Sequence, residues 1–192
     1  PSEYQEVLNS GLEEVERLTR VTEDLLTLAR SDEGAIVARR EDALLDEEAN
    51  ALLSRLSQVA GERGVTLERD VQAPVRIPHD RDLMSRLIWN LLQNAVEHTP
   101  EGGAVRLHVA STAGGAVLEV HDTGPGFPPD ELDRVFERFY RADEARSTGR
   151  DGRHSTGLGL SIVKAIAVAH GGTAVAGRSP LGGAVVRVEI PA

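Results

Sequence analysis

The sequence predicts an α+β fold in which helices cover one face of a mixed β-sheet, preceded by one long amphipathic helix. Three observations lead to this prediction. Apolar residues recur every three or four positions over residues 2–29, which is the period of an α-helix. Later segments with helical spacing alternate with short segments rich in β-branched residues. Glycine or proline follows several of these segments, as expected where one element gives way to the next.

The long first helix carries one apolar stripe with acidic residues and arginines on its other sides. No other segment of the chain has a stripe of similar length, so we expect this helix to pack against a helix upstream or in a partner. Gly34 ends the helical pattern. We therefore predict one helical unit at residues 1–33, a linker at residues 34–45 and one domain at residues 46–192.

The domain is predicted to contain three helices and five strands. The helices cover residues 46–63, 80–98 and 160–170. The strands cover residues 65–69, 105–110, 116–121, 173–177 and 184–190. Ala113, Gly114 and Gly115 separate the second and third strands, which predicts a hairpin.

Composition excludes several classes of function. The formal net charge is −10, and no basic cluster could follow a phosphate backbone, so we expect no nucleic-acid partner. Cysteine is absent, which excludes disulfides, thiolate metal sites and a cysteine nucleophile. No segment resembles a signal peptide or a membrane span of about 20 apolar residues, so we expect a soluble chain. Because it begins with Pro1 rather than Met, we also expect a piece of a longer protein.

Two asparagines share one edge of the helix predicted at residues 80–98. Asn90 and Asn94 lie four positions apart and project from the same side, with Glu97 and His98 close to them. Amide oxygens are hard ligands that suit Mg²⁺, and amide nitrogens can donate to phosphate. The alternative is that both amides are solvated or cap a neighbouring turn.

Strand alternation places Asp122 on the covered face of the sheet. Asp122 is in phase with Leu118 and Val120, so its carboxylate points towards the core and needs a hydrogen-bond donor there. The exocyclic amine of a purine would be a fitting donor. Gly124 and Gly126 would let the backbone approach a flat ring closely. The alternative is an ordinary Asp-x-Gly turn.

The last predicted helix begins with Gly157-Leu-Gly-Leu-Ser161, and free backbone N–H groups at its start could hold a polyphosphate. Neither a Walker motif nor Gly-x-Gly-x-x-Gly is present, and a plain helix start remains the alternative. Residues 127–156 precede it without a core pattern and are predicted to form a mobile lid. Phe136, Phe139 and Tyr140 would anchor its first half, or serve core packing or domain docking.

The order of four motifs resembles the N, G1, F and G2 boxes of the catalytic, ATP-binding domain of bacterial sensor histidine kinases. These motifs are Asn90-Leu-Leu-Gln-Asn94, Asp122-Thr-Gly-Pro-Gly126, Phe136-Glu-Arg-Phe139-Tyr140 and Gly157-Leu-Gly-Leu160. The resemblance implies a GHKL (Bergerat-type) α/β sandwich and transfer of the γ-phosphoryl group of ATP, with Mg²⁺, to a histidine. Residues 1–33 resemble the second helix of that family's dimerisation hairpin, and residues 46–192 its catalytic domain with a lid at about 127–156.

The resemblance also implies roles for individual residues. Asn90 and Asn94 would be the catalytic residues; Asn94 would ligate Mg²⁺, and Asn90 would contact phosphate or metal. Asp122 would bind the adenine amine, and Arg141 would approach the phosphates from the lid. The full set of implied nucleotide contacts is Asn90, Asn94, His98, Asp122, Gly124, Gly126, Arg141, Thr156, Gly157, Leu158, Gly159 and Leu160.

Asn90 favours a histidine kinase over the related ATPases. In those ATPases and in anti-sigma serine kinases the N box begins with Glu, whereas this chain has Asn90. No carboxylate at that position is then placed to deprotonate water or a serine hydroxyl, but a histidine acceptor already has a nucleophilic lone pair. Glu97 stands where the family often has a basic residue; it would weaken nucleotide binding or add a carboxylate beside the metal.

The phosphoacceptor motif of the family, a histidine followed by an acid, a basic residue and proline, surrounds none of the six histidines. We therefore expect the chain to bind ATP without phosphorylating itself. The implied partners are a phosphoacceptor hairpin helix, in cis or in trans, a response regulator and a second copy in the full-length protein. This chain would be cytoplasmic and the full-length protein membrane-anchored. The alternatives are a non-catalytic ATP-binding module, a split-kinase half that acts by docking, and a GHKL ATPase.

Overall fold

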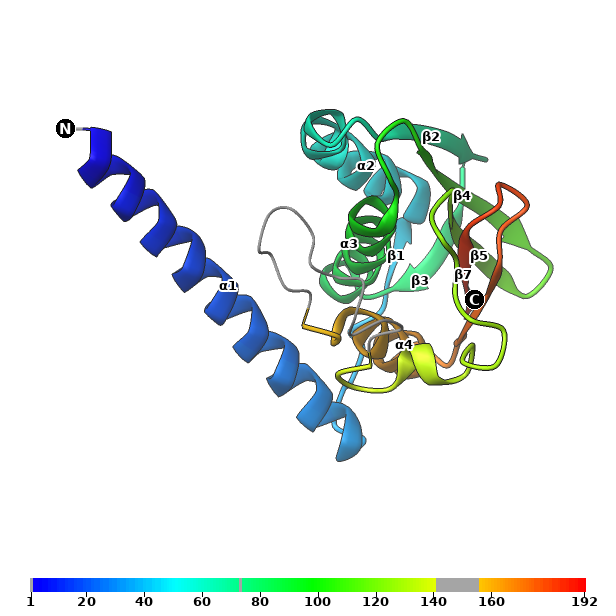
Figure 1. Ribbon diagram of the computed structural model, residues 1–192. Helices are drawn as coiled ribbons and strands as arrows, with labels where there is room; N and C mark the ends of the chain where they lie inside the picture. Colours follow the sequence, from blue (N-terminus) through cyan, green and yellow to red (C-terminus); the bar gives the residue numbers. More distant parts are fainter. Residues whose placement is uncertain (1, 73, 141–155) are drawn as a thin grey trace.

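The computed structural model describes residues 2–72, 74–140 and 156–192, and it consists of one long helix beside a body of helices and sheet (Figure 1). Helix α1 spans Ser2–Asp32, and its N-terminal end lies clear of the body. This arrangement agrees with the predicted long amphipathic helix that precedes an α+β domain. None of the helices in the described ranges is both long and apolar enough to cross a membrane.

A five-stranded mixed sheet forms the centre of the body, with the strand order β2-β4-β5-β7-β6. The strands are β2 (Thr66–Val71), β4 (Ala104–Thr112), β5 (Gly115–Asp122), β6 (Thr173–Arg178) and β7 (Ala184–Pro191). β2 runs parallel to β4, and the other neighbours are antiparallel. β4 and β5 form the predicted hairpin, in which Thr112 pairs with Gly115. The predicted mixed sheet is therefore confirmed.

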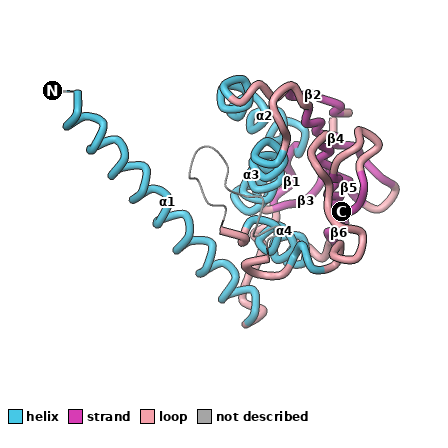
Figure 2. The backbone as a smooth tube through the Cα atoms, viewed as in Figure 1, coloured by secondary structure: helices cyan, strands magenta, loops and turns pink. Residues whose placement is uncertain are grey.

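Three helices lie together on one side of this sheet (Figure 2). They are α2 (Leu45–Glu62), α3 (Arg81–His98) and α4 (Gly159–Ala169). α3 lies between the other two and contacts both. Leu87, Ile88 and Leu92 of α3 are fully buried, and each such side chain contributes about 1.5–3 kcal/mol through burial. The helix that carries both asparagines is thus fixed by the core.

Alternation along the strands separates an apolar face from a charged one. Val105, Leu107 and Val109 of β4 are buried beneath the helices, whereas Arg106 and His108 between them point the other way. On that outer face Arg106 binds Glu68 with 2.6 Å between Nη2 and Oε2. Ion pairs of this kind suit a face without a second layer of helices.

A two-stranded antiparallel sheet forms where the sequence predicts no strand. β1 (Glu41–Leu44) pairs with β3 (Arg76–His79), so Ala43 lies opposite Ile77. β1 lies within residues 34–45, which the sequence predicts to be a linker. Each strand has four residues, and β3 contains Pro78, which gives a weak strand signal because proline cannot donate to a ladder.

The C-terminal half of α1 is attached to the body by arginines. Arg86 of α3 donates to Asp24 Oδ1 over 2.5 Å and to Thr27 Oγ1 over 2.7 Å. Arg138, which follows the buried Phe136, binds Asp32 and the carbonyl oxygen of Leu28. The buried Leu28 side chain joins the core at this point. Among the α1 side chains that the structure describes, the large exposed apolar ones are Val15, Leu18, Leu25 and Leu26.

The first part of the predicted lid is ordered around a single helical turn, η1 (Arg134–Phe136). Phe136 is buried, and the Lys164 ammonium lies 5.6 Å from the centre of its ring. Tyr140 is partly buried and donates a hydrogen bond to Glu131. Phe139 is 63% exposed, so of the three aromatic residues it is not an anchor. The rest of the predicted lid, residues 141–155, lies outside the described residues.

Candidate nucleotide-binding site

Asp122 lies at the end of β5 with its side chain on the covered face, as strand alternation predicts. It is 7% exposed, and Leu118 and Val120 of the same strand are also buried. Its Oδ1 accepts hydrogen bonds from the backbone N–H of Gly124 over 2.8 Å and of Ala184 over 3.0 Å. No residue that the structure describes donates to Oδ2. One carboxylate oxygen is thus fixed by the protein, and the other is left for a further donor.

Burial raises the pKa of Asp122 above its usual value, although the hydrogen bonds from Ala184 and Gly124 act in the opposite direction. The raised pKa means that these two donors do not fully offset the loss of water around the charge. A third donor on Oδ2 would stabilise the ionised form. The electrostatics therefore suit a ligand that brings an N–H group to this oxygen.

The turn after Asp122 packs against the C-terminal end of α3. A Cβ atom at Gly124 would lie 2.7 Å from the carbonyl oxygen of His98, closer than real contacts allow. Gly126 has a φ of 76°, which favours glycine. His98 itself is exposed at the end of α3 and close enough for its charge to act on Asp122. The N-box helix and the G1 turn therefore meet at this point.

Asn90 is a residue of α3, and its side chain faces the start of α4. Its Nδ2 donates to the carbonyl oxygen of Arg86 over 2.9 Å, which fixes the orientation of the amide. Its Oδ1 then faces Gly159, where a Cβ atom would lie 3.3 Å away. Asn94, one turn further along α3, is partly buried and makes no side-chain hydrogen bond with a described residue. Glu97 is also partly buried, and no described residue forms an ion pair with it.

No side chain caps the start of α4, which leaves the first backbone N–H groups of the helix without a capping oxygen. Leu158 occupies the N-cap position, is fully buried and offers no capping oxygen. Thr156, Gly159 and Leu160 around it are partly buried. Gly157 has a φ of 68°, and a Cβ atom there would lie 2.8 Å from the Cα atom of Phe139. The F and G2 motifs are therefore also in contact.

The structure thus brings most of the predicted site residues to one region, where α3, α4 and the ends of β5 and β7 meet. Arg141 lies outside the described residues. Sequence reasoning missed Gly183 and Ala184, which precede and begin β7 and surround the Asp122 carboxylate. Ala184 is 62 residues from Asp122, so only strand pairing reveals the contact. In the sequence, Gly182-Gly183 indicates no more than a turn.

Residues 79–192 match the family described as histidine kinase-, DNA gyrase B- and HSP90-like ATPase. The chain belongs to this family. It is 37% identical over 171 residues to the probable sensor protein PcoS of Escherichia coli, a match that covers 89% of this chain and 36% of that protein. It is 34% identical over 182 residues to the signal transduction histidine-protein kinase BaeS of Escherichia coli K12, covering 93% of this chain and 38% of BaeS.

Among solved structures, full-length ShkA in complex with AMPPNP matches with a TM-score of 0.78 and 30% identity, covering 91% of this chain and 36% of ShkA. The predicted α+β sandwich and the resemblance to the ATP-binding domain of sensor histidine kinases are both confirmed. The chain spans little more than a third of the length of the curated relatives it matches.

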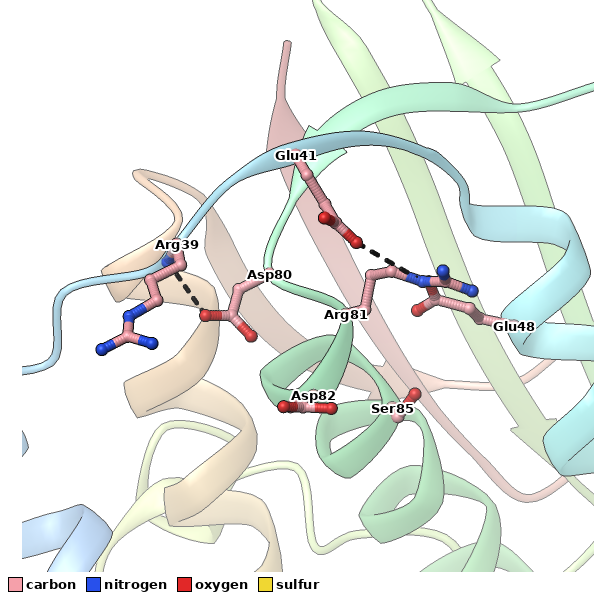
Figure 3. Close-up of a pocket in the computed structure, with 7 residues that line it drawn as sticks. All are labelled: Arg39, Glu41, Glu48, Asp80, Arg81, Asp82 and Ser85. Carbon is pink, nitrogen blue, oxygen red and sulfur yellow. Dashed lines mark hydrogen bonds and ion pairs between the residues drawn. The ribbon is translucent and has the colours of Figure 1, made fainter.

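In this histidine kinase-like domain, a hollow lies at the N-terminal end of α3, away from Asn94 and His98 (Figure 3). Its lining is polar and consists of Arg39, Glu41, Glu48, Asp80, Arg81, Asp82 and Ser85. Asp80 caps α3 because its Oδ1 accepts from the N–H of Leu83 over 3.1 Å. Its Oδ2 accepts from the N–H of Arg39 over 2.9 Å, and its own N–H donates to His170 Nε2 over 3.0 Å. Asp80 therefore joins the segment after α1 to both helices that bear the site.

Two buried histidines beside Asp80 have pKa values shifted in opposite directions. Burial lowers the pKa of His170. Its Nε2 accepts a hydrogen bond from the backbone N–H of Asp80, and its Nδ1 donates to the carbonyl oxygen of Ile166. This pattern, with one ring nitrogen accepting and the other donating, belongs to the neutral ring. Burial also acts to lower the pKa of His79, but hydrogen bonds to Glu48 and to the carbonyl oxygen of Ile77 outweigh it and the pKa is raised. Both ring nitrogens of His79 face acceptors, which favours the charged form.

These shifts predict opposite pH dependences of stability. The pKa of His170 is lowered from 6.5, so the unfolded chain binds the proton first on acidification and the contribution of His170 falls below pH 6.5. The pKa of His79 is raised from 6.5, so its contribution is complete below pH 6.5 and is lost as the pH rises through the folded value.

Urea unfolding of wild type, His170→Gln and His79→Gln across pH 5–8 measures both contributions. The free-energy difference between wild type and His170→Gln should grow with pH up to about 6.5, by at most about 1.4 kcal/mol per pH unit. The difference in the free energy of unfolding between wild type and His79→Gln should shrink as the pH rises above about 6.5. Parallel pH profiles of stability for all three proteins would contradict the opposite pKa shifts of His170 and His79.

Proposed function

We propose that this chain binds ATP and transfers its γ-phosphoryl group to a histidine on a hairpin helix that is not part of it. The observation that carries the proposal is the Asp122 carboxylate. It is buried and held through Oδ1, and Oδ2 faces no described donor. The exocyclic amine of adenine supplies the missing donor. Guanine carries a carbonyl at the equivalent ring position, which a carboxylate would repel.

The phosphates of ATP would lie between α3 and the start of α4. The uncapped N–H groups of α4 and the positive end of its dipole favour an anion there. Gly157 and Gly159 keep side chains away from this helix end. Asn90 lies against Gly159 and would contact the same phosphates from α3.

The amides of α3 have donor atoms that fit Mg²⁺. Asn94 is the stronger candidate because its side chain makes no hydrogen bond with a described residue, and Asn90 Oδ1 lies one turn away. Within the described ranges no group of three or more His, Asp or Glu side chains could hold a metal on its own. The phosphates of ATP would therefore complete the ligand set, and bound Mg²⁺ would neutralise part of their charge.

The same site favours phosphoryl transfer to histidine over hydrolysis. Position 90 is an asparagine, and its neutral amide cannot take a proton from a water molecule as a carboxylate could. A neutral histidine acceptor needs no base, and the protein has only to position the reactants and balance charge. BaeS, a relative at 34% identity, is named as a histidine-protein kinase, which supports this reading.

We further propose that residues 1–33 are the second helix of a dimerisation hairpin. Residues 34–45, which contain β1, would connect this helix to the catalytic domain at residues 46–192. The exposed apolar side chains of α1 include Val15, Leu18 and Leu25, and a helical partner would cover them. The full-length protein would form a homodimer, be anchored in the inner or plasma membrane and pass the phosphoryl group to a response regulator. This chain would lie in the cytoplasm.

Asp122→Asn should weaken ATP binding by about ten- to a hundredfold. The amide keeps an acceptor for Gly124 and Ala184 but replaces the second oxygen by an NH₂ group, which repels the adenine amine. Isothermal titration calorimetry with ATP and Mg²⁺ measures the change. Asp70→Asn, on the outer face, is the matched control and should bind as wild type does. Equal affinity of Asp122→Asn and wild type would refute the role of Asp122.

Incubation with radiolabelled ATP, Mg²⁺ and a separately produced hairpin bearing the phosphoacceptor histidine should label the hairpin only. The label should be stable to alkali and labile to acid, and a hairpin with glutamine in place of that histidine should stay unlabelled. Label on this chain would contradict the proposal. ATP binding without transfer would favour a non-catalytic or docking module. Steady hydrolysis that Glu97→Gln abolishes would favour an ATPase.

A further inference from the structure

The turn between β6 and β7 closes over the buried carboxylate of Asp122. It is held by the N–H of Ser179, which donates to Gly183 O over 2.9 Å, and by the N–H of Gly182, which donates to Ser179 O over 3.0 Å. The N–H of Gly183 then reaches the backbone carbonyl of Asp122 over 3.2 Å. Ala184, the next residue, supplies one of the two donors to Asp122 Oδ1. The turn therefore determines where that oxygen sits.

Gly183 has no room for a side chain. A Cβ atom there would lie 2.2 Å from Asp122 Oδ1, 2.5 Å from the N atom of Gly124 and 2.6 Å from the backbone oxygen of Asp122. Its φ is not in the left-handed region that favours glycine. Space, not backbone conformation, is therefore the reason for glycine at this position.

A side chain at position 183 would act directly on the site. A single methyl group would overlap Oδ1 and the two backbone atoms that frame it, so the carboxylate or the turn must move. Either movement lengthens at least one of the hydrogen bonds from Gly124 and Ala184. Oδ2 would then move as well, because the two oxygens belong to one rigid group.

We propose that Gly183 is a positioning residue that sets the orientation of the Asp122 carboxylate and thereby the selectivity of the site for purines with an amino group at C6. This inference rests on the proposed ATP binding and deepens it. Gly183 touches no ligand in this account and acts through Asp122. A side chain at position 183 should therefore remove the preference for the amine and leave the contribution of the phosphates in place.

The test compares ATP with purine riboside triphosphate, which lacks only the 6-amino group. Calorimetry with Mg²⁺ gives both dissociation constants for wild type, Gly183→Ala and Gly114→Ala. Gly114 is the matched control because a Cβ atom there would meet nothing within 4 Å. Wild type and Gly114→Ala should prefer ATP by about tenfold or more. Gly183→Ala should bind both nucleotides alike, at the affinity that wild type has for the analogue.

Each other outcome has a distinct meaning. If Gly183→Ala weakens both nucleotides equally and keeps the preference, or changes nothing, the inference is wrong and the proposed function stands. If wild type binds neither nucleotide, the proposed function itself fails. If wild type binds both equally, the amine contact of Asp122 fails, and the inference fails with it.

Circular dichroism checks that Gly183→Ala folds. If it does not, Ala184→Pro provides the same comparison, because it removes the N–H donor to Oδ1 at the first residue of β7, where proline is tolerated. It too should lose the preference for ATP over the analogue. A retained preference would overturn the inference.

Discussion

The burial of a carboxylate at the end of a central strand constrains this domain more than any other interaction. Removing an ion of this kind from water costs several kcal/mol unless donors replace the lost hydration. Asp122 receives two backbone N–H groups on Oδ1, and its pKa nevertheless stays raised by burial. The protein fixes the position of the charge, but its two donors do not fully replace the hydrogen bonds that water would make. A ligand with an N–H donor can supply a further hydrogen bond to the carboxylate.

Much of the local architecture follows from holding that carboxylate. The turn after β5 must bend sharply enough to return the N–H of Gly124 to the side chain, and the turn before β7 must supply the N–H of Ala184. Glycine is required at position 183 because a Cβ atom would lie 2.2 Å from Asp122 Oδ1, and at position 124 because a Cβ atom would lie 2.7 Å from the carbonyl oxygen of His98. At the other end of α3, Asp80 and His170 tie α3 to α4. The helices that would hold the phosphates are thereby fixed relative to each other.

The position of α1 adds a second constraint. Arg86 binds Asp24 and Thr27 of α1, and it also offers its carbonyl oxygen to Asn90. One residue of α3 thus contacts both the long helix and an amide of the candidate site. Arg138 makes a comparable link from the F motif to Asp32. The orientation of α1 in the described structure therefore depends on the same segments that form the site.

Local periodicity predicted the parts of the structure that depend on local sequence. The stripe of α1, the core face of α3 around Leu87, and the inward direction of Asp122 all follow from spacing alone. The strands β1 and β3 could not be predicted, because four residues with Pro78 give no clear alternation and the pairing joins distant segments. Ala184 and Gly183 were missed for a related reason, since their role appears only when β7 pairs beside β5.

A crystal structure of this chain with a non-hydrolysable ATP analogue and Mg²⁺ tests the central claim most directly. The distance that matters is between the exocyclic nitrogen of adenine and Asp122 Oδ2. We expect this distance to be about 2.7–3.2 Å, with Oδ1 still bound to the N–H groups of Gly124 and Ala184. An adenine ring bound away from Asp122, or an Asp122 carboxylate rotated out of both backbone hydrogen bonds, would contradict the account.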